Sequence, residues 1–116
     1  MPVFRDRLTA LEIDLLAFLA YYRHAAKLHG SRAAPLSIAP VIKVAGGTLA
    51  QRSADLLVQA AGEAGASAED IVLTSGAVNV AAELFEMRRL SVGSGTTEIN
   101  RNIIAKRVLG LADAER

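Results

Sequence analysis

Hydrophobic residues recur at three- and four-residue steps in several stretches of the chain, and this spacing is typical of amphipathic α-helices. The first stretch runs from about Arg5 to Leu28 and carries apolar residues on more than one side. We therefore expect it to be a central helix that contacts several neighbours. A linker follows at Ser31 to Leu36, where Pro35 disfavours helix at the preceding residue.

A second helix is predicted from a cap at Ser37 to about Ala61, with apolar and small residues at near-heptad spacing. This seam suits close packing against a partner helix and comprises Ile38, Ile42, Ala45, Leu49, Ser53, Leu56 and Ala60. Gly46 and Gly47 interrupt the pattern. Each glycine costs about 0.8–1 kcal/mol relative to alanine inside a helix, so the pair marks either a bend or a crossing point.

The second half of the chain predicts shorter elements. A capped start at Ser67 to Asp70 leads to a short helical turn at Ile71 to Leu73, and a further helix runs from about Ala77 to Leu90. The last helix is capped by Thr96 and stops near Gly110, and we expect the tail from Ala112 to Arg116 to fray. This helix is predicted to bury Ile99, Ile103, Ile104 and Val108. The whole pattern predicts one all-α domain over residues 1–116, an antiparallel four-helix, up-and-down bundle.

Composition narrows the possible functions. A net charge of +1 without a concentrated basic face argues against nucleic-acid binding. The chain has no cysteine, and no second cluster of acidic or histidine residues accompanies His24 and His29, so we expect no metal site. No apolar run approaches the ~20 residues that a membrane helix needs, and the N-terminus lacks an apolar signal core. We therefore expect a cytoplasmic protein without membrane contact.

A glycine-rich turn before the last helix is the main candidate for chemistry. Gly93 and Gly95 flank Ser94, so the backbone can take positive φ and allow close approach of another molecule. Thr96 can cap the following helix, and Glu98 lies at its positive end. Such a turn suits either an anion held by converging N–H groups or an ordinary helix cap. From these residues alone the ordinary helix cap is favoured, because helix caps are common and anion sites are not.

The same residues resemble a known signature. The stretch from Gly93 to Leu111 is similar to the C-terminal signature of the flavin-dependent acyl-CoA dehydrogenases, Tyr-Glu-Gly-Thr-x-Glu/Gln-Ile-Gln-Arg followed by a helix ending in Leu-Gly-Leu. By this resemblance, Gly95 is the pattern's glycine, and Thr96 and Glu98 are the pair that contacts FAD. Asn100 replaces a glutamine, Gly93 replaces the aromatic residue, and Ser94 stands where the best-known members carry the catalytic glutamate.

A second motif extends the resemblance along the chain. The family carries Gln-x-x-Gly-Gly-x-Gly at the turn that contacts the adenosine-diphosphate half of an FAD bound by the neighbouring subunit. Gln59, Gly62 and Gly65 match this pattern, whereas Glu63 replaces its second glycine with an acid. Independently of the resemblance, Gly62 suits a left-handed C-cap of the second helix. Arg88 and Arg89 either correspond to a basic pair that precedes the signature or complement a helix C-terminus; the second interpretation is favoured.

The resemblance implies a flavin-dependent α,β-dehydrogenation of an acyl-CoA thioester, as in the breakdown of fatty acids or steroids. Ser94 is not expected to act as the base, because a serine hydroxyl without a partner histidine to activate it is too weakly basic to take up an α-proton. Glu98 at a helix N-terminus is not assigned catalysis either. By the same resemblance, we expect the chain to lack the first helix of the family's C-terminal domain, and its N-terminal and middle domains.

Two functions follow from this reading. The chain is either the C-terminal domain or a truncated form of such an enzyme, or a noncatalytic helical oligomerisation or binding module derived from the family. In the first case the complete enzyme binds acyl-CoA, and the chain forms a homo-oligomer or a heteromer with a base-bearing subunit. We expect the isolated chain to be inactive.

Overall fold

The computed structural model of the chain describes residues 2–28 and 38–111. These residues form, in order, α1 (Pro2–Leu28), α2 (Ile38–Ala61), the 3₁₀ helix η1 (Gly62–Ala66), β1 (Ile71–Leu73), β2 (Gly76–Val78), α3 (Val80–Arg89) and α4 (Thr97–Arg107). The helical fold is confirmed. The predicted linker, the cap at Ser37 and the C-terminal tail lie outside the described residues. None of the helices within residues 2–28 and 38–111 combines the length and the apolar composition that a membrane-spanning helix requires.

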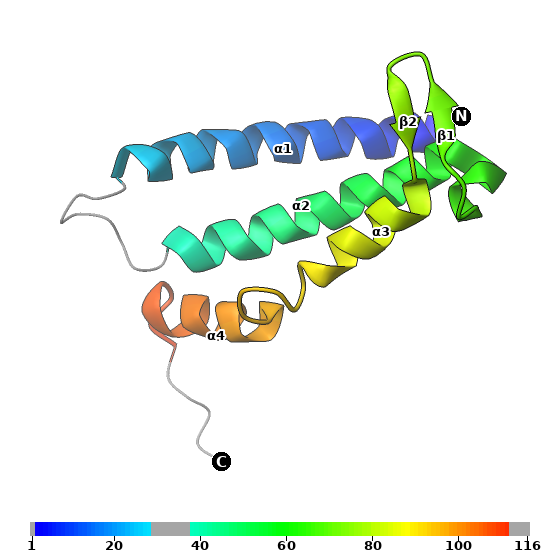
Figure 1. Cartoon of the computed structure of the whole chain (residues 1–116). Helices are drawn as coiled ribbons and strands as arrows, with labels where there is room; N and C mark the ends of the chain where they lie inside the picture. The colour runs from blue at the N-terminus through cyan, green and yellow to red at the C-terminus, as the bar shows by residue number, and fades with distance from the viewer. Residues whose placement is uncertain (1, 29–37, 112–116) are drawn as a thin grey trace.

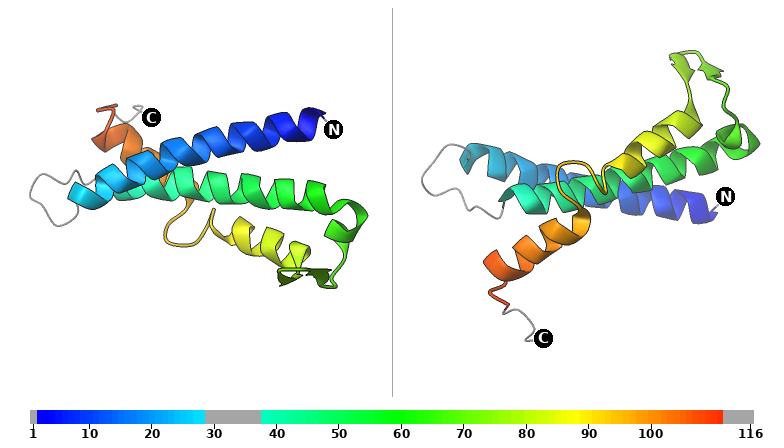
Figure 2. Two further views of the ribbon diagram at one scale, coloured as in Figure 1. Left: turned by 90° about the horizontal axis from the view of Figure 1, so that it is seen from above. Right: turned by 60° about the horizontal axis from the view of Figure 1, so that its bottom comes forward.

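The second helix, α2, forms the centre of the molecule. Figures 1 and 2 show α1 antiparallel to α2 on one side, while α3 and α4 follow one another along other parts of α2. The prediction that the first helix is central was wrong, because α1 packs mainly against α2 and leaves Leu16 67% exposed. The apolar residues of α1 beyond its α2-facing side therefore have no neighbour among the described elements that covers them.

Small residues explain why α2 can take neighbours on two sides. A Cβ atom at Gly46 would lie 3.1 Å from the ring of Phe18 on α1, and one at Gly47 would lie 3.9 Å from Leu90. The helix continues without a break through both glycines. Of the two alternatives for this pair, the structure thus supports a crossing point, because each glycine faces a different neighbour of α2.

The core is small and lies between α1 and α2. Leu11, Leu49 and Leu56 form its buried cluster, with Phe4 and Phe18 packed against it. The prediction that the last helix buries its apolar residues was wrong for two of them, because Ile99 is 54% and Val108 is 48% exposed. The other two predicted residues, Ile103 and Ile104, are half-buried. One face of α4 meets α2, and no other described element covers the opposite face.

A β-hairpin replaces the predicted helical turn at Ile71 to Leu73. β1 and β2 pair antiparallel in the register Ile71↔Val78, Val72↔Ala77 and Leu73↔Gly76. Branched residues favour strand, and Gly76 takes a φ of 138° directly after the turn. The next helix therefore begins at Val80 rather than Ala77, where the Asn79 side chain caps it by accepting a 2.9 Å hydrogen bond from the Ala82 N–H.

Candidate functional site

The glycine-rich turn joins α3 to α4 and is called here the signature turn, residues 93–98. The backbone is closed across its first part because the Thr97 N–H donates to the Ser91 carbonyl, two residues before the turn, at 3.0 Å. Gly95 has a φ of 89°, as its residue type allows, but the other positive φ, 60°, falls on Ser94 itself. The sequence places glycines on both sides of Ser94, yet Gly93 does not use positive φ. Ser94 therefore carries the strain of the turn.

The predicted cap of the last helix is present. Thr96 has extended backbone angles, and its Oγ1 accepts a hydrogen bond of 3.2 Å from the Ile99 N–H. Glu98 lies in the first turn of α4 with its side chain exposed. Both residues stand at the positive end of the helix, an arrangement that favours a negatively charged group nearby. Their predicted contact with a cofactor stays a prediction.

Two residues that hold the signature turn were missed in the sequence. Asn100 is only 8% exposed, and its Nδ2 donates to the carbonyls of Gly95 at 3.3 Å and Thr96 at 2.9 Å. Lys43 of α2 donates from Nζ to the Leu90 carbonyl just before the turn. An asparagine four residues after a capping residue is a usable sequence signal for the contacts of Asn100, because its side chain can reach the backbone of the preceding turn. No sequence pattern pointed to Lys43, because its partner is a distant backbone group.

A polar hollow of about 260 Å³ lies where the signature turn meets α2. It is lined by Val44, Gly47, Thr48, Gln51, Leu90, Ser91, Thr97, Glu98 and Arg101. Hydroxyl hydrogens of Thr48 and Thr97 point to backbone carbonyls, at 2.8 Å and 3.3 Å, which leaves oxygen lone pairs for another donor. The Arg101 guanidinium makes no hydrogen bond or ion pair with another described residue. The hollow is smaller than a usual ligand pocket, so it suits one part of a larger molecule.

The second predicted motif lies at the far end of α2. Gln59 is exposed, and its Oε1 accepts a hydrogen bond of 3.0 Å from Arg7. Gly62 has the predicted left-handed conformation, with a φ of 58°, and a Cβ there would meet no atom within 4 Å. Gly65 is buried, and a Cβ there would lie 2.8 Å from the Val58 carbonyl oxygen. The backbone therefore has free space beside it at Gly62, whereas at Gly65 it is packed against Val58.

The structure does not bring the two motifs together within one chain. The signature turn meets α2 near Gln51, and Gln59 lies eight residues further, about 12 Å along the helix. Between them α3 is fixed to α2 by Arg88, which donates to Asp55 at 2.5 Å and to Gln51 at 3.3 Å. Gln59 and Gly62 thus form one candidate contact region, and the signature turn forms another.

The two arginines at the end of α3 have different partners. Arg88 reaches across to α2, whereas Arg89 forms an exposed ion pair with Glu86 one turn earlier on α3. The hydrogen bond and the positive charge of Arg89 lower the pKa of the Glu86 carboxyl below its ordinary value of 4.5. The solvated-helix-end interpretation fits Arg89, and Arg88 serves to dock α3.

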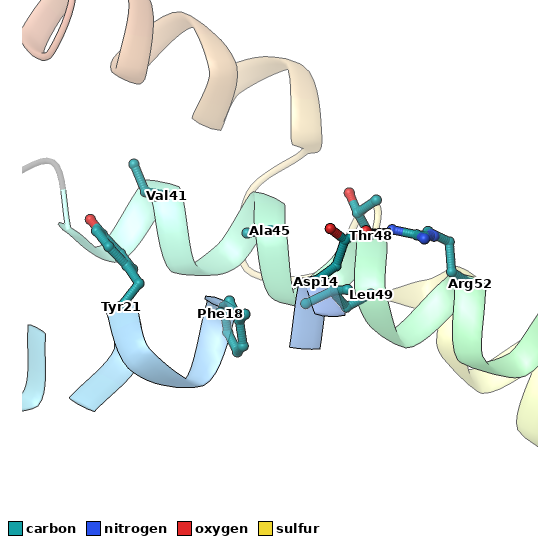
Figure 3. Close-up of a pocket in the computed structure, with 8 residues that line it drawn as sticks. All are labelled: Asp14, Phe18, Tyr21, Val41, Ala45, Thr48, Leu49 and Arg52. Atoms are coloured by element: carbon teal, nitrogen blue, oxygen red, sulfur yellow. Dashed lines mark hydrogen bonds and ion pairs between the residues drawn. The ribbon is translucent and has the colours of Figure 1, made fainter. Parts of the chain in front are cut away.

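A second concavity, about 320 Å³ in volume, opens between α1 and α2 (Figure 3). Phe18 and Tyr21 of α1 line it together with Val41 and Ala45 of α2, and the ion pair between Asp14 and Arg52 lies toward one end. Its walls are mainly apolar, and its arginine is already neutralised by the aspartate at 2.5 Å. Among the described residues, no group of three or more histidine or acidic side chains could hold a metal ion.

Comparison with known families confirms the resemblance to the acyl-CoA dehydrogenases. The model of the family described as acyl-CoA dehydrogenase, C-terminal domain, matches residues 1–109. Neither the curated proteins nor the solved structures gave a significant match. The matched range contains every described helix, the turn at Gln59 and Gly62, and the whole signature turn. The chain therefore belongs to the acyl-CoA dehydrogenase C-terminal domain family.

Proposed function

We propose that this chain supplies one wall of the FAD site in an acyl-CoA dehydrogenase and takes part in packing its subunits. The observation that carries the proposal is the capped signature turn, with Gly95 at a φ of 89° beside a hollow lined by Arg101, which pairs with no other residue that the structure describes. The family generally binds FAD, which accepts hydride from the substrate when it is bound. This hollow offers hydroxyl, amide and guanidinium groups to the polar edge of such a molecule.

The residues of the turn have separable tasks in this proposal. Gly95 allows a ligand to approach the backbone because it has no side chain. Any other residue there would be strained at a φ of 89°, and its Cβ would lie 3.3 Å from Asn100 Nδ2. Thr96 and Glu98 orient the ligand at the start of α4, and Arg101 attracts its negative charge. Gln59 and Gly62 contact a second FAD, which a neighbouring subunit holds, and their distance from the signature turn supports this division.

The chain provides no base for the dehydrogenation in this proposal. Ser94 occupies the position of the family's glutamate, and a serine hydroxyl does not take up an α-proton near neutral pH without an activating base. A partner chain that carries the carboxylate would complete the site and bind the acyl-CoA. The isolated chain is accordingly inactive toward acyl-CoA, and its contribution is to hold FAD and assemble with that partner.

Calorimetry with FAD and ADP on the full chain tests the flavin contact, with two cap variants compared. Thr96→Ala and Asn79→Ala each remove a side chain that caps a helix, but only the first lies in the signature turn. We expect Thr96→Ala to weaken binding about twofold to tenfold, the loss of one neutral hydrogen bond. Asn79→Ala loses its cap, worth ~1 kcal/mol, and also the Nδ2 hydrogen bonds to the Ala68 carbonyl (2.8 Å) and Asp70 (3.1 Å), so it should lower stability at least as much as Thr96→Ala and still leave affinity unchanged.

The alternatives give different results in the same experiment. If the folded, unmutated chain binds neither FAD nor ADP, the flavin contact is wrong for this polypeptide, and the noncatalytic binding module is the better function. Equal losses of affinity in both cap variants would show that Thr96 acts only through stability. Thr96→Ser keeps a capping hydroxyl and should retain binding, which separates the hydroxyl from the overall fold.

A further inference from the structure

Helix α1 carries a stripe of exposed residues that its neighbour α2 does not cover. The α1 stripe consists of Glu12, Leu16, Leu19 and Arg23, whose spacings of four, three and four residues place them on one helix face. Leu16 is 67% and Leu19 is 37% exposed, and both charged residues are exposed. The side that packs on α2 carries Leu11, Phe18 and Ala25, about 130° around the helix.

The two charges of the stripe have no opposite charge within reach on their own helix. A helical ion pair needs a partner three or four residues away. Those positions hold Leu8, Thr9, Leu15 and Leu16 around Glu12, and Leu19, Ala20, Ala26 and Lys27 around Arg23. The ion pairs found among the described residues include neither Glu12 nor Arg23. The stripe thus presents two exposed leucines between a negatively charged Glu12 and a positively charged Arg23.

We propose that the α1 stripe pairs antiparallel with the same stripe of a second copy of this chain. A twofold axis between positions 17 and 18 sets Leu16 against the partner subunit's Leu19 and Glu12 against the partner subunit's Arg23. Symmetry repeats both contacts on the other side of the axis, as a self-complementary interface requires. The inference rests on the proposed function for the assumption that the chain assembles with other subunits, and it names the surface that does so.

Charge complementarity selects this arrangement over others. In a parallel pairing, Glu12 would face the partner's Glu12 and Arg23 would face the partner's Arg23, so like charges would repel. In the antiparallel register each carboxylate meets a guanidinium, and the same register brings the exposed leucines together at the centre. The same antiparallel register therefore brings the leucines into contact and also places each charge opposite a charge of the other sign.

Sedimentation equilibrium on the full chain tests the pairing. We expect a dimer at micromolar concentration for the unmutated chain and a monomer for Leu16→Glu, which places a charge at the centre of the interface. Val3→Glu is the matched control, because Val3 is 62% exposed but lies about 140° around α1 from Leu16. It should remain a dimer. Circular dichroism on both variants verifies that the helices are retained.

Charge reversal tests the register itself. Glu12→Arg and Arg23→Glu should each raise the dimer Kd about tenfold, because every dimer then contains two like-charge contacts. The double variant exchanges the two charges and should restore the original Kd. If the double variant is as weak as the single variants, or if all of them match the unmutated chain, the proposed register is wrong.

Engineered cysteines provide a direct check, since the chain has none of its own. A mixture of Glu12→Cys and Arg23→Cys chains should form a mixed disulfide under oxidation. Either variant alone should not, because its two sulfurs would be offset by eleven residues, about 16 Å along the helix, beyond the reach of a disulfide. Efficient self-crosslinking of Glu12→Cys would indicate parallel helices and refute the proposal.

The outcomes separate this inference from the flavin proposal. A monomeric chain that binds FAD or ADP overturns the pairing and leaves the proposed flavin contact in place. A dimer that loses association on Leu16→Glu supports the pairing, even if calorimetry finds no flavin binding. A dimer that Leu16→Glu leaves intact assembles through another surface, and the α1 stripe is then not its interface.

Discussion

Removing the Asn100 side chain tests whether the signature turn is held by buried hydrogen bonds. In Asn100→Ala, the Nδ2 contacts to the carbonyls of Gly95, at 3.3 Å, and Thr96, at 2.9 Å, are lost. The longer contact lies just beyond the usual 2.7–3.2 Å range for such bonds, so it counts for less than the shorter one. The Thr96 carbonyl keeps its bond from the Asn100 backbone N–H at 3.1 Å and is not left unpaired.

These contacts set the expected magnitude. One neutral hydrogen bond contributes about 0.5–1.5 kcal/mol, so one strong and one weak bond together contribute about 1–2 kcal/mol. Alanine is a better helix former than asparagine by roughly 0.5 kcal/mol, which partly offsets the loss. Asn102→Ala in the same helix has this gain but removes an exposed side chain without a hydrogen bond to another described residue. The difference between the two variants therefore isolates the Asn100 contacts.

Denaturant unfolding and thermal melting measure this difference. We expect Asn100→Ala to be about 1–2 kcal/mol less stable than Asn102→Ala, equivalent to a Tm lower by roughly 3–8 °C for a domain of this size. Hydrogen exchange at the Thr97 N–H, which closes the turn onto Ser91, should also be faster in Asn100→Ala. Equal stabilities of the two variants would refute the idea that Asn100 holds the turn.

Two further variants address the strained residue and the exposed ion pair. Ser94→Gly should raise the unfolding free energy by about 0.5–1 kcal/mol. Glycine relieves the strain of the left-handed φ of 60°, and the larger entropy of its unfolded chain offsets part of that gain. Ser94→Ala is the control, because it keeps a Cβ and should give no increase. Arg89→Gln should return the lowered pKa of Glu86 to the ordinary range in an NMR titration, because the lowering comes from Arg89. A carboxyl whose pKa is lower in the folded state stabilises the fold above its unfolded pKa and loses that contribution as the pH falls through the folded pKa. A Glu86 pKa that does not respond to Arg89→Gln would refute this cause.

Local signals in the sequence predicted the elements that depend on neighbouring residues. The helical periodicity located α1 and α2 closely, and the capping preference of threonine located the start of α4. Gly62 was recognised as left-handed because glycine takes that conformation after a helix at little cost. Each of these features is decided within about one helical turn, which is the range over which a single sequence is informative.

The errors concern features that depend on distant partners. Periodicity shows that a helix has an apolar face but not which helix covers it, so α1 was predicted as central although α2 takes that place. The segment at Ile71 to Leu73 is too short for its period to distinguish a strand from a helical turn, and its pairing with Gly76 to Val78 decides the matter. The contacts of Lys43 and Arg88 join elements far apart in sequence, and no local pattern encodes them.

The contacts that shape the signature turn do not involve the Ser94 side chain in any hydrogen bond found among the described residues. Asn100 ties the turn from inside α4, Lys43 holds its entrance from α2, and Thr96 caps the helix beyond it. The contacts that shape the turn are thus separable from Ser94, the residue that the resemblance places at the position of the family's glutamate. A chain can therefore exchange the glutamate for serine there and keep a turn shaped for a ligand, provided that another chain supplies the base. In the proposed function, this separation lets the family signature remain in a subunit that holds FAD and does not itself remove the proton.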